Sequence, residues 1–140
     1  MPTSRVVLPE TIRIELTGGD WIEIKQRLNA GEMIALFDMS ADPERPGMID
    51  ERRAGVGLIV SYVVAWSMVG PDGTPIRIDG ADAMRGALLS FDWDTFNELL
   101  TAVRTHDAAR REEKKRRADG IGSSPLSISL AAAGGGTSGF

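Results

Sequence analysis

Residues 61–78 read Ser-Tyr-Val-Val-Ala-Trp-Ser-Met-Val-Gly-Pro-Asp-Gly-Thr-Pro-Ile-Arg-Ile, and this stretch decides the fold. Its first nine residues close an uncharged, largely apolar segment that runs from Ala54 to Val69. That segment has 16 residues, fewer than the roughly 20 that cross a bilayer as a helix. Gly-Pro-Asp-Gly at 70–73 then matches a type I turn, with proline second and glycine fourth. The stretch therefore predicts a core element, and not a membrane segment, followed by a reversal of the chain.

The apolar segment is predicted to form the central helix of the core. Ile49 or Asp50 is its expected start, because acidic residues favour the positive end of a helix dipole. From there we expect it to continue through Trp66 with apolar side chains on nearly every side, which is typical of a buried helix. Many of these residues are β-branched, so a strand remains an alternative. The apolar residues with the helical period are Val56, Ile59, Val60, Val63, Val64 and Trp66.

The N-terminal part of the chain predicts a β-hairpin. Apolar and polar residues alternate over 11–16 and again over 21–25, which is the period of a strand with one buried face. Thr-Gly-Gly-Asp at 17–20 separates the two runs, and its glycines can take the positive φ values that a tight turn needs. The elements expected after the hairpin are a helix over 28–39 entered near Asn29, a proline-containing loop over 40–47, the central helix, an edge strand over 74–78 and a helix over 81–89.

The last element is predicted to be a long helix with an apolar first half and a charged second half. Asp92 or Asp94 is its expected N-cap, and Thr95 with Glu98 has the spacing of a capping box. We expect the helix to reach Ala118, because its charged residues have good helix propensity, and to end at Asp-Gly. Its first half has the clearest amphipathic pattern of the chain: Phe96, Leu99, Leu100 and Val103.

These elements together predict an α+β fold, in which an N-terminal β-hairpin packs on a small bundle of three to four helices. Residues 1–118 are expected to form the domain. Residues 119–140 are rich in serine, glycine and alanine, and we expect a flexible, disordered tail because such a composition buries little apolar surface. The predicted structural core consists of Ile12, Ile14, Ile22, Ile24, Val63, Trp66, Phe96, Leu99, Leu100 and Val103.

The sequence contains little that could perform catalysis. It has no cysteine and one histidine, His106, which excludes thiolate chemistry and metal sites built from several such side chains. Asp92 and Asp94 are better explained as helix caps than as an acid–base pair. Gly55 and Gly57 lack the further residues of a phosphate-binding loop and instead suggest close helix packing. The three tryptophans are expected to anchor one core and not to form a ligand cage. We therefore expect a protein that is not an enzyme and that needs no metal or cofactor.

Two segments are candidates for binding a partner. Six of the eight residues over 110–117 are basic, which suits either a solvated helix end or an electrostatic contact with an acidic partner. The tail adds a short alternating apolar cluster. The overall charge of −4 and the lack of interleaved aromatic residues make nucleic acid an unlikely ligand. The candidate partner-binding residues are Arg110, Arg111, Lys114, Lys115, Arg116, Arg117, Leu126, Ile128 and Leu130.

A series of short motifs runs through residues 8–118. They are Leu-Pro-Glu-Thr at 8–11, Gly-Asp-Trp-Ile-Glu-Ile-Lys at 19–25, Leu-Asn-Ala-Gly-Glu at 28–32, Val-Ala-Trp-Ser at 64–67 with Asp-Gly-Thr-Pro-Ile at 72–76, and Phe-Asn-Glu-Leu at 96–99 followed by His106. In pattern and order they resemble the tail assembly chaperones of long-tailed, siphovirus-type bacteriophages. The pair of motifs around Trp66 carries the strongest part of this resemblance, which includes no catalytic motif.

The resemblance implies a non-enzymatic chaperone that acts in the cytoplasm of the bacterial host. Such a protein binds the tape measure protein and helps to recruit tail tube subunits, and we expect several copies to act together along that partner. Family members often occur also as a longer, frameshifted form. The alternative is a structural protein of the virion, such as a component of the tail tube or of the head–tail connector. A third class, a small regulator that binds acidic partners or nucleic acid, would depend on the basic run.

Overall fold

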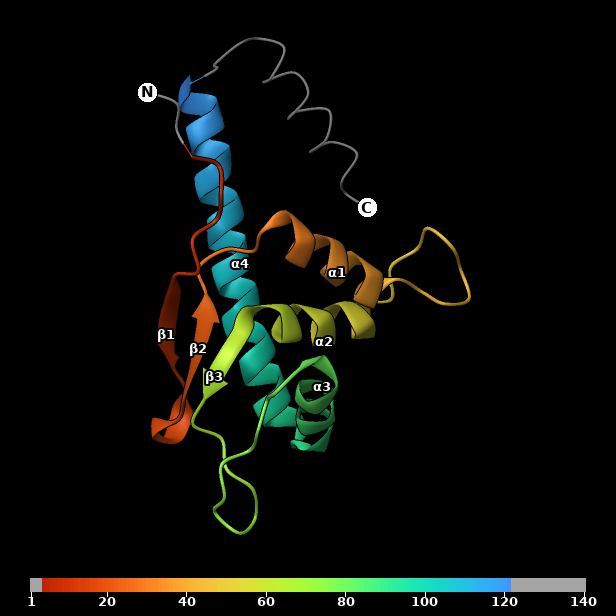
Figure 1. The fold of residues 1–140 in the computed structure, drawn as a ribbon, viewed down its shortest axis with the longest axis vertical. Helices are drawn as coiled ribbons and strands as arrows, with labels where there is room; N and C mark the ends of the chain where they lie inside the picture. The colour runs from red at the N-terminus through yellow and green to blue at the C-terminus, as the bar shows by residue number, and fades with distance from the viewer. Residues whose placement is uncertain (1–3, 122–140) are drawn as a thin grey trace. The chain divides into compact units, whose positions relative to one another are not determined.

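The computed structural model describes residues 4–121 and has the predicted α+β architecture (Figure 1). An N-terminal three-stranded antiparallel sheet is combined with four α-helices. The chain divides into two compact units, Met1–Thr105 and His106–Phe140, and the boundary falls within the last helix. The predicted disordered tail lies, from residue 122 onward, outside the described residues.

The predicted hairpin is confirmed. Strands β1 (Thr11–Glu15) and β2 (Trp21–Lys25) pair in antiparallel register, with Ile12 opposite Ile24 and Ile14 opposite Ile22. Apolar residues of both strands therefore project to the same face of the sheet. The connection is a short 3-10 turn, Thr17–Gly19, whose two glycines both have positive φ. The reversal depends on this conformation, which residues with a Cβ atom adopt only at a cost.

The central segment differs from the prediction, because its last part is a strand and not helix. Helix α2 (Glu51–Tyr62) ends where the chain extends into β3 (Val63–Trp66). Strand β3 pairs antiparallel with β2 and places Trp66 opposite Ile22, so the sheet order is β1-β2-β3. The consecutive β-branched residues 63 and 64 favour extended backbone, and the free edge of β2 supplies the hydrogen-bonding partners. The predicted hairpin is thus two-thirds of a larger sheet.

Helices α1 (Ala30–Ser40) and α2 lie side by side, and the loop between them projects beyond their ends (Figure 1). Asn29 caps α1 through a capping box with Glu32: its side chain accepts from the backbone N–H of Glu32, whose carboxylate accepts from the N–H of Asn29. A Cβ atom on Gly57 would lie 3.2 Å from Leu36 Cδ1 and 3.3 Å from Met39 Cβ. The glycine therefore permits close contact between the two helices, as the sequence suggested.

The chain reverses after β3 as predicted, although the expected edge strand over 74–78 is only a single bridge between Val69 and Pro75. Helix α3 (Ala81–Ser90) follows, and α4 spans Trp93–Ile121, slightly beyond the predicted end. Asp92 caps α4 by accepting from the N–H and hydroxyl of Thr95. The predicted capping box with Glu98 is wrong, because Glu98 instead accepts from the N–H and hydroxyl of Thr17.

The core of the first unit lies between the sheet and the helices. Each predicted core residue belongs to it: Ile12, Ile14 and Phe96 are half-buried against it, and the others are buried. Only one of the three tryptophans anchors this core, contrary to expectation. Trp66 is buried, Trp21 is half-buried beneath the guanidinium of Arg13, and Trp93 is exposed and stacked on Phe96. The core is completed by Ile59, Tyr62, Met68, Met84 and Leu88.

Candidate partner-binding surface

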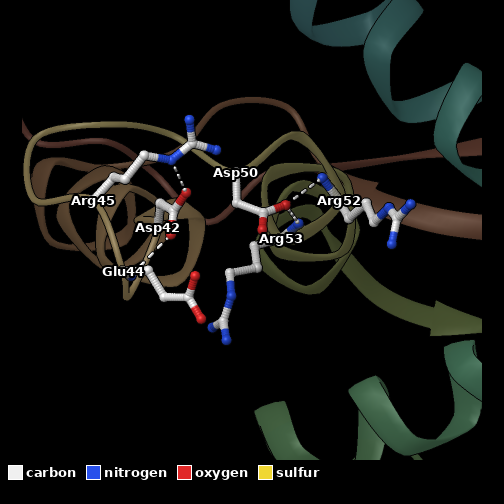
Figure 2. Close-up of polar contacts among 6 residues, drawn as sticks. All are labelled: Asp42, Glu44, Arg45, Asp50, Arg52 and Arg53. Atoms are coloured by element: carbon white, nitrogen blue, oxygen red, sulfur yellow. Dashed lines mark hydrogen bonds and ion pairs between the residues drawn. The ribbon is translucent and has the colours of Figure 1, made fainter.

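The loop between α1 and α2 is held by a network of its own hydrogen bonds (Figure 2). Asp42 accepts from the backbone N–H of Glu44 at 2.9 Å and from Nε of Arg45 at 3.2 Å. Backbone bonds close the loop at its base, from the N–H of Asp42 to Met48 O and from the N–H of Asp50 to Ser40 O, both at 2.9 Å. These hydrogen bonds give the loop a defined backbone, although it contains two prolines.

This loop and the outer face of α1 together expose four large apolar side chains. We name Ile34, Phe37, Met48 and Ile49 the α1 patch; each is more than half exposed. Ile34 and Phe37 are three residues apart and so share one helical face. Ala41 continues that face and forms an antiparallel bridge with Ile49, and residues opposed in such a bridge project to the same side. Ile49 is therefore placed on the side of Ile34 and Phe37. Met48 precedes it in the same loop and is a further exposed apolar side chain beside this face.

The sequence predicted the helix but not this patch. The apolar residues of α1 lie on two faces of the helix and not on one. Leu36 is buried against Gly57, whereas Phe37 is 57% exposed. A short helix with more apolar residues than one face can bury is the signal that could have revealed a second surface.

The predicted basic segment lies on α4 within the second unit. Three of its six residues pair with carboxylates of the same helix: Arg110 and Arg117 with Glu113, and Arg111 with Asp107. Such exposed pairs contribute little to stability, about 0.3–0.5 kcal/mol each. The other three, Lys114, Lys115 and Arg116, are exposed and form no ion pair with any residue from 4 to 118. They are three consecutive positive charges distributed around the helix.

The remaining predicted contact residues, Leu126, Ile128 and Leu130, lie outside the described residues. The structure therefore does not test a contact between the basic segment and the apolar cluster of the tail. Both remain predicted binding segments.

The carboxylates that the sequence singled out have structural partners. The hydrogen bonds from Thr95 lower the pKa of Asp92, as expected for a helix cap. Glu98 lines an open hollow of about 590 Å³ in the first unit, but both its oxygens are engaged by Thr17. Within residues 4–121, no three histidine, cysteine or acidic side chains are grouped so as to hold a metal ion. In that same part of the chain, no helix is both long and apolar enough to cross a membrane.

The surface of the described residues thus offers apolar contact and positive charge. Comparisons of the chain with family models, with curated proteins and with solved structures give no match. Function is therefore inferred from the geometry of the surface and from the resemblance carried by the sequence motifs.

Proposed function

We propose that this protein is a bacteriophage tail assembly chaperone, which binds the tape measure protein and helps to recruit tail tube subunits without catalysing a reaction. The α1 patch is the observation that carries the binding role. The motif resemblance supplies the identity of the partner, since the patch alone fits many apolar surfaces. The place of action is the cytoplasm of the bacterial host during assembly.

The α1 patch is suited to covering an apolar face of a helix. A partner that buried its four side chains would gain about 25 cal/mol per Å² of apolar surface removed from water. The fixed loop backbone reduces the conformational entropy that is lost on binding, because the segment of Met48 and Ile49 is already held by backbone hydrogen bonds. Four side chains make only a small contact, so each copy is expected to bind weakly. Several copies along a long partner would then give a strong but reversible association.

The exposed charges of Lys114, Lys115 and Arg116 support the same role. Positive charge that is not neutralised locally accelerates encounter with an acidic partner and gives little affinity of its own at physiological salt. We expect its contribution to decrease as the ionic strength rises, since exposed charges are screened over about 8 Å at 0.15 M salt.

Co-expression with the tape measure protein of the same phage tests the proposal. We expect the chain to raise the soluble fraction of that protein. A variant carrying Ile34→Asp and Phe37→Asp should lose this effect. The control carries Val6→Asp and Val69→Asp, which add the same charge at two exposed apolar positions outside the α1 patch. Equal solubility of the tape measure protein with and without the chain would refute the proposal.

Mass spectrometry of purified particles separates the chaperone from the structural alternative. A chaperone leaves before the tail is complete, so its peptides should be absent or far below the level of tail tube peptides. Stoichiometric presence in the particles would favour a structural virion protein instead.

A further inference from the structure

A second surface of the first unit, distinct from the α1 patch, combines positive charge with exposed apolar groups. Helices α2 and α3 pack against each other and leave a shallow groove of about 260 Å³ between them. Arg52, Arg53 and Val56 of α2 line one wall, and Arg85 and Leu89 of α3 line the other. We name these five residues the arginine groove. Neither the basic run on α4 nor the resemblance pointed to it.

The three arginines of the groove form no ion pair in the described part of the chain, although Glu51 and Asp82 lie near them in sequence. Asp50 is hydrogen-bonded to both Arg52 and Arg53. Its carboxylate accepts only from their backbone N–H groups, at 2.9 and 3.3 Å, and not from their guanidinium groups. Figure 2 shows both guanidinium groups extending away from that carboxylate. Throughout residues 4–121, no ion pair involves Arg52, Arg53 or Arg85. Six other arginines do form ion pairs: Arg13, Arg45, Arg77, Arg110, Arg111 and Arg117.

The position of these charges is unfavourable for the isolated fold. Arg52 and Arg53 stand in the first turn of α2, where the helix dipole favours acidic residues. Arg85 of α3 lines the same groove and adds a third positive charge to it. Residues that oppose local preferences, such as the preference for acidic residues at a helix N-terminus, occur mainly at functional sites. A negatively charged ligand in the groove would offset this unfavourable dipole interaction and neutralise the three charges.

The apolar lining decides the class of that ligand. Leu89 is 69% exposed, and Val56, which also lines the groove, is half-buried. A phosphate backbone would satisfy the arginines but leave Leu89 in contact with water. A helix that carries carboxylates beside leucine-like side chains at helical spacing would satisfy both. The net charge of −4 of the chain further disfavours a nucleic acid.

We propose that the arginine groove binds an acidic amphipathic helix of a partner protein. The carboxylates of the helix pair with Arg52, Arg53 and Arg85, and its apolar side chains cover Leu89 and Val56. This site is separate from the α1 patch, so it holds whether or not the partner at that patch is a tape measure protein.

A labelled synthetic peptide tests the groove directly. The probe is a fluorescein-labelled helix of about five turns, with leucine at the i, i+3, i+4 and i+7 positions and glutamate beside them. Fluorescence anisotropy at about 50 mM salt measures its binding to the full chain. We expect saturable binding that weakens at about 300 mM salt, and an at least about tenfold loss in the variant R52A/R53A/R85A. Leu89→Ser alone should also weaken binding, because it removes the exposed apolar contact.

The matched control is R27A/R77A/R104A, which removes the same charge outside the groove. We expect it to bind the peptide within about twofold of the unmodified chain, since surface charges away from a contact contribute little. Circular dichroism should show that both triple variants keep the helical content of the unmodified chain.

Three outcomes would overturn the proposal. The first is that the unmodified chain binds the probe no more tightly than it binds the same peptide with glutamine in place of glutamate. The second is an equal loss of binding in the groove variant and the control variant. The third is tighter binding of a single-stranded oligonucleotide that depends on the same three arginines, which would make the groove a nucleic-acid site.

Discussion

The indole Nε1 of Trp66 donates a hydrogen bond to the backbone carbonyl oxygen of Ile76 at 3.0 Å. This bond fastens the strand that ends at Trp66 to the segment that returns after the turn. The backbone N–H of Ile76 adds a bond to Met68 O at 3.0 Å, and the ring of Phe91 packs edge-on against the indole, with centroids 5.4 Å apart. One buried side chain therefore joins the sheet, the connecting loop and the segment before α4.

We expect Trp66→Ala to lower the free energy of unfolding by about 3–5 kcal/mol, because it leaves a large cavity and an unpaired carbonyl oxygen. Chemical denaturation followed by circular dichroism measures this change. Trp93→Ala is the control: Trp93 is 71% exposed and contacts Phe96 by stacking, so its loss should cost about 1 kcal/mol or less. A folded Trp66→Ala protein of unchanged stability that failed only to bind a partner would show that Trp66 has a binding role.

Glycines on α2 and α3 should respond differently to a larger side chain. Gly57→Leu is expected to destabilise by about 1–3 kcal/mol, because Leu36 and Met39 of α1 already lie at contact distance from the site of a Cβ atom. Gly86→Ala should stabilise by about 0.5–1 kcal/mol, since nothing lies within 4 Å of its Cβ position and alanine is the better helix former. Thermal unfolding of the two variants compares them directly. A stabilising Gly57→Leu would mean that α1 and α2 are not closely packed.

Two buried serines should have opposite effects when changed to alanine. The hydroxyl of Ser61 has no hydrogen-bond partner among the described residues, so Ser61→Ala is expected to stabilise the chain by about 1 kcal/mol. The hydroxyl of Ser40 donates to Leu36 O at 2.7 Å, and Ser40→Ala should cost about 0.5–1.5 kcal/mol. Urea denaturation of both variants tests the contrast. A loss of stability in Ser61→Ala would reveal an interaction of that hydroxyl.

The sequence predicted most of the fold because most of its signals are local. The alternation of apolar and polar residues on both sides of the Gly-Gly turn predicted the hairpin. The spacing of Phe96, Leu99 and Val103 predicted the buried face of α4. The sequence did not predict β3, because a run of β-branched apolar residues fits a helix or a strand equally well. The edge of β2 decides between them, and that edge exists only once the chain has folded.

The candidate surfaces were less predictable than the fold. Which side of α1 faces solvent depends on the position of Gly57 across the helix interface, which no local pattern encodes. The arginine groove requires α2 and α3 to meet, because Arg85 is more than 30 residues from Arg52 and Arg53 in sequence. The charge run on α4 was visible because it is contiguous, but the sequence did not reveal that half of it is paired within the helix.

The ion pair between Lys25 and Glu32 makes stability depend on pH. Burial raises the pKa of Glu32, but the hydrogen bond from the backbone of Asn29 and the interaction with Lys25 outweigh it, so this pKa lies below its ordinary value of 4.5. A carboxylate with a lowered pKa in the folded state stabilises the fold above its unfolded pKa. This stability is lost as the pH falls through the folded pKa.

We therefore expect Glu32→Gln to be less stable than the unmodified chain at pH 7, by about 0.2–1 kcal/mol, because glutamine keeps the cap but not the charge. The difference should shrink as the pH decreases and vanish once Glu32 is protonated in the folded state. Denaturation curves collected across this range measure it. A difference that stayed constant with pH would mean that the charge of Glu32 does not contribute.

The last prediction concerns the orientation of α1, on which the α1 patch depends. Leu36 and Phe37 are adjacent in sequence, but Leu36 is 8% exposed and Phe37 is 57% exposed. Leu36→Ser should destabilise the chain by about 2–5 kcal/mol, because it removes a buried side chain that touches Gly57. Phe37→Ser should change stability by no more than about 0.5 kcal/mol, as expected for an exposed position. Guanidinium denaturation of the two variants gives both values. The reverse ranking would place Phe37 in the core and abolish the α1 patch, whereas the expected ranking leaves Phe37 available to a partner.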